Sequence, residues 1–146
     1  MSMPPHPAHP TPATLHLPLH GESAAADARH AARAFLDQPA GGGHPFPAPV
    51  LDAALLVVSE LVTNAVRHAG GRCALDMRLR SDGIDIEVTD GSSQEPLARR
   101  PDQQGEGGWG WHLVNRISTD VEIRHHHGPR AGKTIHVHVA RGSLGG

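Results

Sequence analysis

Apolar positions along this chain recur with two different spacings, and each spacing predicts one kind of element. Through residues 50–69 the apolar side chains return every three or four positions, which is the repeat of an amphipathic helix. Residues 23–36 are rich in alanine and contain neither glycine nor proline, which predicts a second helix with Ser23 as its N-cap. Helical spacing returns at residues 111–117 and predicts a short third helix. The predicted buried stripe of the longest helix comprises Leu51, Leu55, Val58, Val62, Val66 and Ala69.

Alternation of apolar and polar residues predicts five strands. Residues 15–19 form a short edge strand, because Pro18 has no N–H group to donate within a sheet. Residues 73–79 and 84–88 alternate on either side of the turn residues Ser81-Asp82-Gly83, which predicts a hairpin. Two more strands follow at residues 121–125 and 134–140. Together these elements predict an α+β fold: a two-layer α/β sandwich with a mixed, mostly antiparallel sheet and the helices on one face.

Proline and glycine gather between the periodic segments and mark the organisation of the chain. Five of the 13 prolines fall in the first twelve residues, which predicts a disordered tail rich in proline and histidine over residues 1–14. One domain is predicted over residues 15–141, and residues 142–146 form a flexible C-terminus. Residues 90–109 break all periodicity and end in a glycine cluster. A structureless stretch of that length inside a small domain is usually functional.

Composition narrows the class of protein. Thirteen Lys and Arg stand against 15 Asp and Glu, and a net charge of -2 argues against direct binding to nucleic acid or anionic lipid. No run approaches the ~20 apolar residues that span a bilayer, and the N-terminus lacks a signal-peptide pattern. We therefore expect a soluble, cytoplasmic protein without membrane contact. The single cysteine, Cys73, is expected to be a small core hydrophobe.

Three polar segments could carry chemistry. Glu60 and Asn64 lie one turn apart on the long helix, and Arg67 and His68 continue that side. Taken alone, such residues are ordinary on the solvent side of a helix. Asp90 follows a strand, and an ionised carboxylate there suits an exocyclic amine such as that of adenine. The glycine-rich loop runs into a helix, where backbone N–H groups suit a phosphate.

Four motifs in order, SELVTNAVRHA, VTDGS, GGWGWHLV and GKT, resemble those of the histidine-kinase-like (GHKL) ATPase domain, whose architecture is the Bergerat fold. More narrowly, they resemble those of the small anti-sigma-factor serine/threonine kinases of bacterial partner-switching systems. The resemblance covers about residues 15–140. The helix motif is the most specific of the four, and the glycine loop or GKT alone would be weak.

The resemblance implies Mg-ATP as the ligand and a role for each matching residue. Asn64 would be the Mg²⁺ ligand, Glu60 the general base, and Asp90 the acceptor for the adenine amine, with Gly91 allowing the base to lie close to the backbone. Residues 93–107 would form the ATP lid. The further nucleotide contacts that it implies are Arg67, His68, Gly108, Trp109, Gly110, Trp111, His112, Leu113 and Thr134. Trp111 also suits simple core packing, and Trp109 suits packing on the domain as well as stacking on a base.

The function implied is a regulator that sequesters a sigma factor and phosphorylates a STAS-type anti-sigma antagonist on Ser or Thr. Because no phosphoacceptor-histidine helix precedes the domain, we expect this rather than a sensor histidine kinase. Trp109 stands where the family commonly has arginine, which leaves an alternative: an ATP-binding module that captures a partner without kinase activity. The resembled kinases are typically homodimers, and the composition leaves that point open.

Two other interpretations compete for particular segments. GPRAGKT resembles a phosphate-binding P-loop, but it has three residues between its glycines instead of four and leads into a predicted strand. Thirteen histidines suggest a metal-responsive protein, yet few other ligands have zinc-like spacing. His136 and His138 alternate with apolar residues, so we expect them on a solvent-facing strand surface.

Overall fold

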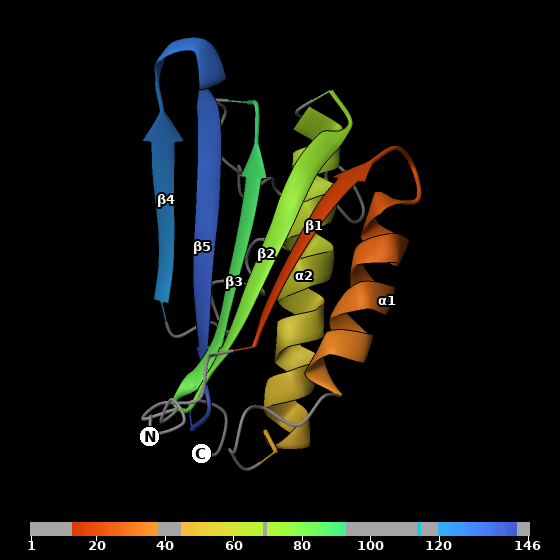
Figure 1. The fold of residues 1–146 in the computed structure, drawn as a ribbon, viewed down its shortest axis with the longest axis vertical. Coiled ribbons are helices and arrows are strands. Elements are labelled where there is room, and N and C mark those ends of the chain that lie inside the picture. The colour runs from red at the N-terminus through yellow and green to blue at the C-terminus, as the bar shows by residue number, and fades with distance from the viewer. Residues whose placement is uncertain (1–12, 38–44, 69, 93–113, 115–119, 143–146) are drawn as a thin grey trace, which may run out of the picture.

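Five strands form a single sheet in the order β1-β2-β3-β5-β4 (Figure 1). The computed structural model describes residues 13–37, 45–68, 70–92, 114 and 120–142. Every neighbouring pair of strands is antiparallel. The predicted edge strand, hairpin and two closing strands are all confirmed. Their bounds are Thr14–His20 for β1, Arg72–Arg80 for β2, Gly83–Asp90 for β3, Asp120–His126 for β4 and Gly132–Ala140 for β5.

Two helices, α1 (Ala24–Leu36) and α2 (Ala48–His68), cover one face of the sheet (Figure 1). The α+β sandwich predicted from the sequence is therefore confirmed. Helix α2 begins two residues earlier than predicted, because Pro49 fits the first turn of a helix, where N–H groups have no helical partner. Ser23 occupies the N-cap position of α1, but its hydroxyl donates to Asp27 Oδ2 (2.8 Å) instead of capping the backbone.

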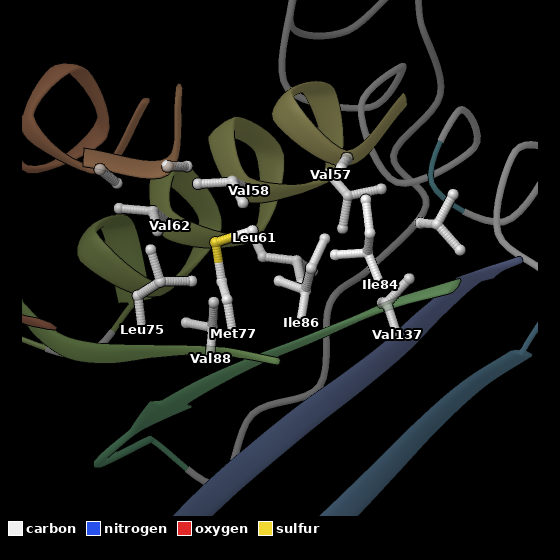
Figure 2. Close-up of a cluster of buried hydrophobic side chains, with 14 of the residues drawn as sticks. Val57, Val58, Leu61, Val62, Leu75, Met77, Ile84, Ile86, Val88 and Val137 are labelled. Carbon is white, nitrogen blue, oxygen red and sulfur yellow. The ribbon is translucent and has the colours of Figure 1, made fainter. Parts of the chain in front are cut away.

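The core lies between α2 and the sheet. Val57, Leu61 and their neighbours on α2 point at the apolar side chains of the three central strands (Figure 2). On β3 every second residue faces the helices, and Ile84, Ile86 and Val88 are at most 1% exposed. The residues labelled in Figure 2 are Val57, Val58, Leu61, Val62, Leu75, Met77, Ile84, Ile86, Val88 and Val137.

The buried face of α2 differs from the predicted stripe. Val58 and Val62 are buried as predicted, but Leu51, Leu55 and Val66 are only partly buried. The fully covered side is centred on other residues: Val50, Ala53, Ala54, Val57, Val58, Leu61, Val62 and Ala65. The physical reason is that α2 contacts both α1 and the strands β2, β3 and β5. The helix and the sheet together bury a face of α2 that is wider than the predicted stripe and rotated from it.

Helix α2 is long and apolar enough to pass a length and composition test for a membrane span, although polar residues interrupt its apolar sequence. Residues 48–67 of α2 have a mean hydropathy of 1.6 over a helix long enough to span a bilayer. Half of that segment is buried inside the domain, against the sheet and α1. Its apolar residues are thus accounted for by the core of a small α+β domain, and the core helix of a soluble protein passes the same test.

Several predicted segments lie outside the described residues. These are residues 1–12 of the predicted tail, the lid and glycine loop up to residue 113, and residues 143–146. Of the predicted third helix only Val114 is described, and it is helical and fully buried. The P-loop interpretation is rejected by the local structure, because a short 3-10 turn, η1 (Gly128–Arg130), leads into β5 and not into a helix.

Candidate functional site

Three elements meet at one end of the domain. Helix α2 ends there, β3 ends there and β5 begins there (Figure 1). This arrangement places the C-terminal half of α2, which carries Glu60 and Asn64, at the same end of the domain as Asp90, the last residue of β3. The resemblance drawn from the sequence implies that these three residues belong to one site. The structure brings the ends of α2 and β3 to the same end of the domain, as such a site requires.

Asp90 points to the helix-covered side of the sheet. It continues the alternation of Ile84, Ile86 and Val88, so its carboxylate points to the same face of the sheet as these buried side chains. Its side chain is 1% exposed. A buried carboxylate must be paired or heavily hydrogen-bonded, because removing the charge from water is costly.

Lys133 supplies the pairing charge. It is the direct cross-strand partner of Asp90, and its side chain is 0% exposed. Its ammonium donates to both carboxylate oxygens of Asp90, at 3.0 Å to Oδ1 and 2.9 Å to Oδ2. The N–H of Ser92 donates to Oδ1 of Asp90 at 2.8 Å, and a third, longer contact of 3.4 Å runs from Lys133 Nζ to the Ser92 carbonyl. The end of β3 thus holds a buried ion pair between Asp90 and Lys133.

Cys73 lies beside the same carboxylate on the other flank. It precedes Ala74, which pairs with Thr89 on β3. Burial, with a smaller contribution from the negative charge of Asp90, raises the pKa of the Cys73 thiol to about 11. The thiol is therefore protonated at neutral pH and behaves as the small buried hydrophobe that the sequence predicts.

Two glycines shape the backbone around Asp90. Gly132 has a φ of 156°, and a Cβ on it would collide with the carbonyl oxygen of Asp90. Only a glycine therefore lets β5 begin so close to the end of β3. Gly91 is exposed, and a Cβ there would meet none of the described atoms within 4 Å. The residue that follows Asp90 is therefore free of close packing among the described atoms.

The helix residues of the predicted site line the second half of α2. Glu60 and Asn64 are half buried, one turn apart as predicted. Arg67 is exposed in the last turn, and His68 is the final residue of the helix. An amide oxygen such as that of Asn64 is a suitable Mg²⁺ ligand, and a half-buried carboxylate such as Glu60 can accept a proton.

Thr134 lies on the other face of the sheet from Asp90. It follows Lys133 in β5, and neighbouring side chains of a strand point to opposite faces. Its hydroxyl lies 2.9 Å from the hydroxyl of Thr89 and 2.7 Å from Nε2 of His126. The structure therefore brings Lys133, and not the side chain of Thr134, to the carboxylate. The remaining sequence candidates, Gly108, Trp109, Gly110, Trp111, His112 and Leu113, lie outside the described residues.

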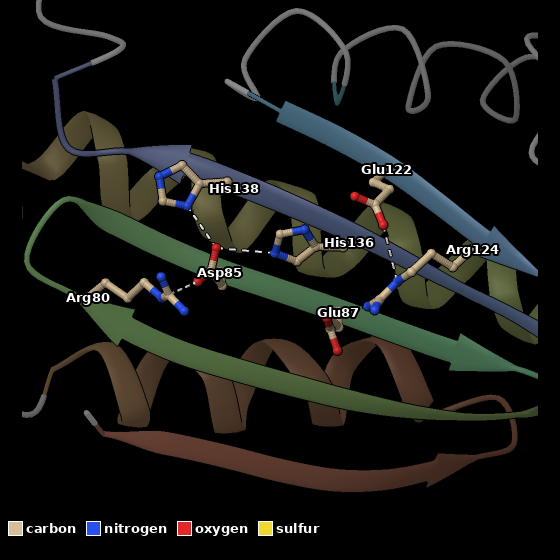
Figure 3. A network of polar contacts seen from close by, with 7 residues as sticks. All are labelled: Arg80, Asp85, Glu87, Glu122, Arg124, His136 and His138. Atoms are coloured by element: carbon tan, nitrogen blue, oxygen red, sulfur yellow. Dashed lines mark hydrogen bonds and ion pairs between the residues drawn. The ribbon is translucent and has the colours of Figure 1, made fainter. Parts of the chain in front are cut away.

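The open face of the sheet carries a separate polar network (Figure 3). His138 Nδ1 and His136 Nε2 lie 2.7 and 3.2 Å from Oδ1 of Asp85, and Arg80 Nε donates to its Oδ2 at 2.8 Å. Burial alone would raise the pKa of Asp85, but the hydrogen bonds from His138 and His136 and the nearby positive charges outweigh it and lower that pKa. As predicted, both histidines face away from the core.

A depression of about 700 Å³ lies on this open face, lined by Arg80, Asp85, Glu87 and His136 among others. It lies on the side opposite Asp90 and Lys133, so it is distinct from the candidate nucleotide site. Within the part of the chain that is described, no group of three His, Cys, Asp or Glu side chains could hold a metal ion.

Comparison with known protein families shows to which family the domain belongs. The family model described as "Histidine kinase-like ATPase domain" matches residues 21–138, well over half of the chain. The chain belongs to the histidine kinase-like ATPase family. A comparison with curated proteins gave no match.

The described residues of this histidine kinase-like ATPase domain fit an ATP site. Asp90 offers a buried acceptor for an amine, Gly91 follows it at an exposed position, and Asn64 offers an amide oxygen for Mg²⁺. Lys133 is the residue that sequence reasoning missed. The sequence did contain a signal for its burial. Lys133 precedes Ile135, Val137 and Val139 at a spacing of two, so its side chain points to the same buried face of β5.

Proposed function

We propose that this protein is a Mg-ATP-dependent serine/threonine kinase of the anti-sigma-factor type. It would hold a sigma factor inactive and phosphorylate a STAS-type antagonist on Ser or Thr. The observation that carries the proposal is the placement of Asp90 and Gly91 at the end of β3, at the same end of the domain as the Glu60 and Asn64 face of α2. The match of residues 21–138 to the histidine kinase-like ATPase family supports the nucleotide.

Each residue has a role that its chemistry allows. Asp90 accepts a hydrogen bond from the base, and Asn64 ligates the Mg²⁺ that accompanies the phosphates. ATP supplies the γ-phosphoryl group. Glu60 takes the proton from the attacking Ser or Thr hydroxyl as its oxygen bonds to phosphorus, and ADP leaves with the bond between the β- and γ-phosphates broken.

Nucleotide binding is tested by titration calorimetry with ATP, with and without Mg²⁺. We expect the wild-type protein to bind ATP about tenfold more tightly with Mg²⁺, which corresponds to about 1.4 kcal/mol. Asn64→Ala should lose that dependence. Asp52→Asn is the matched control, because Asp52 is an exposed residue of the same helix far from its C-terminal half. An Asn64→Ala variant with an intact Mg²⁺ effect would contradict the assigned ligand.

Transfer is tested separately with ATP labelled at the γ-phosphate and the STAS-domain proteins of the same organism. The expected result is label on one of them, lost in Glu60→Gln while ATP binding is kept. Capture of a partner with ATP bound and no label transferred would instead support the alternative of a binding module without kinase activity.

A further inference from the structure

We propose that Lys133 reads the nucleobase together with Asp90, so that the site recognises an adenine ring by a donor and an acceptor side by side. The inference rests on the proposed ATP-binding function and goes beyond it, because it assigns base recognition to a lysine. In this scheme Asp90 accepts from the exocyclic amine of the base, and Lys133 donates to the neighbouring ring nitrogen N1.

The geometry of the ammonium group is the first support. A lysine ammonium has three hydrogens to donate. Two of them are used well, at 3.0 and 2.9 Å to the two oxygens of Asp90. The third contact, to the carbonyl oxygen of Ser92, is 3.4 Å long, beyond the usual range for an N–H···O bond. That third hydrogen is the one that a ligand acceptor can take over at little cost.

The carboxylate has a matching free position. Oδ1 of Asp90 accepts from both Lys133 and the N–H of Ser92. Among the described residues, Oδ2 accepts from Lys133 alone, and a carboxylate oxygen has two lone pairs. Oδ2 can therefore accept a second hydrogen bond while the ion pair stays intact. An acceptor position on Asp90 and a weakly bonded hydrogen on Lys133 thus lie side by side, as recognition of a single ligand edge would require.

The burial of the pair argues for a role beyond stability. Buried ion pairs are often no more stabilising than apolar residues of similar size, because both charges lose their water. Lys133 is the second residue of β5 and shares the phase of Ile135 and Val137, where an apolar residue would continue the core. A lysine there is explained if its charge serves a ligand. Gly91, the residue after Asp90, is exposed, so the buried pair lies next in the chain to an exposed position.

The chemistry of the base follows from this pattern. The amine of adenine donates, and the adjacent N1 accepts, so the edge of adenine is complementary to Oδ2 of Asp90 beside Nζ of Lys133. A base that keeps the amine but lacks the N1 acceptor would satisfy Asp90 and leave the lysine hydrogen without its ligand partner. A hydrogen bond to a charged donor is among the stronger ones, so its loss is measurable.

The test is a thermodynamic cycle that changes one atom of the ligand, N1 of the base, and one residue of the protein, Lys133. Binding of ATP is compared with binding of the ATP analogue that has a C–H group in place of N1, in the wild type and in Lys133→Met. We expect the wild type to bind the analogue about tenfold or more weakly. Lys133→Met should bind the two nucleotides equally. Arg130→Met is the matched control, because Arg130 is an exposed cation just before β5, and it should keep the wild-type discrimination.

The outcomes separate this inference from the proposed function. Equal loss of affinity for the analogue in the wild type and in Lys133→Met overturns the role of Lys133 while ATP binding stands. Tighter ATP binding by Lys133→Met would also overturn it, since the lysine would then be a competitor of the base. If Lys133→Met does not fold, the wild-type comparison still decides, because equal binding of both nucleotides means that no donor reads N1. Failure of the wild type to bind ATP at all overturns the proposed function itself.

Discussion

The ammonium of Lys133 lies 3.0 and 2.9 Å from the two carboxylate oxygens of Asp90, and both side chains are almost completely buried. The two residues are direct partners across β3 and β5, at the end of the sheet where α2 also ends. One relationship thus connects strand register, core burial and the residue that we propose as the acceptor for the base. It gives Asp90 a structural role in addition to the proposed ligand-binding one.

Replacing Asp90 alone should destabilise the fold more than replacing Asp90 and Lys133 together. Asp90→Asn leaves the Lys133 ammonium buried without its counter-charge, and we expect a loss of about 3 kcal/mol in the free energy of unfolding. The double variant Asp90→Asn, Lys133→Met should recover most of that loss. Urea denaturation measures both. Asp76→Asn is the control for an exposed pair, with His16, and should change stability by less than about 1 kcal/mol. A double variant no more stable than the single one would contradict this reading.

The two glycines beside the pair should respond differently to alanine. Gly132→Ala places a methyl group against the carbonyl oxygen of Asp90 and forces φ out of a glycine region, so we expect a loss of about 2 kcal/mol in stability. Gly91→Ala has free space and should leave stability within about 0.5 kcal/mol, but it should weaken ATP binding. Thermal unfolding and ATP titration of the two variants check this contrast. Equal stability of the two variants would show that β5 does not require a glycine at its start.

Cys73 should resist thiol reagents in the folded protein. Its pKa is raised to about 11 by burial and by the charge of Asp90. At pH 8 about one thiol in a thousand is then ionised, against roughly a quarter for an unperturbed cysteine. The rate of reaction with a disulfide reagent should therefore be far slower in the native protein than in urea. Equal rates in both conditions would mean that the thiol is neither buried nor near the carboxylate.

Asp85 on the open face should make the free energy of unfolding decrease at acid pH. Its pKa is lowered in the folded state, since the hydrogen bonds from His138 and His136 outweigh the effect of burial. A lowered folded pKa adds stability above the unfolded value of about 3.9, and that stability is lost as pH falls through the folded pKa. We therefore expect Asp85→Asn to cost about 1 kcal/mol at pH 6 and progressively less below about pH 4. Urea denaturation at several pH values measures the trend, and a constant difference would refute it.

The fold could be predicted because its signals are local. Alternation in residues 73–79 and 84–88 and the turn between them determined the hairpin, and the register of β3 with β5 follows the same alternation. The buried face of α2 was less predictable, because it depends on where α1 packs, which the helix alone does not encode. Ser23 occupies the N-cap position of α1 as predicted, but its hydroxyl donates to Asp27 and not to the backbone.

Candidate site residues could be named from the sequence where they lie in recognisable motifs, and their roles stay predictions. Asp90 and the helix residues Glu60 and Asn64 could be named from their spacing and their resemblance to a family. Lys133 could not be found by motif, because GKT drew attention to Thr134, whose hydroxyl instead contacts Thr89 and His126. Strand phase was the better guide, since a lysine in the phase of Ile135 and Val137 requires a buried acid opposite it.

Nucleotide binding at this end of the sheet is tested by ATP titration of the wild type and of Asp90→Ala by calorimetry, with circular dichroism confirming that both are folded. We expect the wild type to bind Mg-ATP and Asp90→Ala to bind it at least about tenfold more weakly, a difference of about 1.4 kcal/mol. A wild type that shows no binding at about millimolar ATP, or an Asp90→Ala variant that binds as tightly as the wild type, would contradict the assignment of the nucleotide to this end of the sheet.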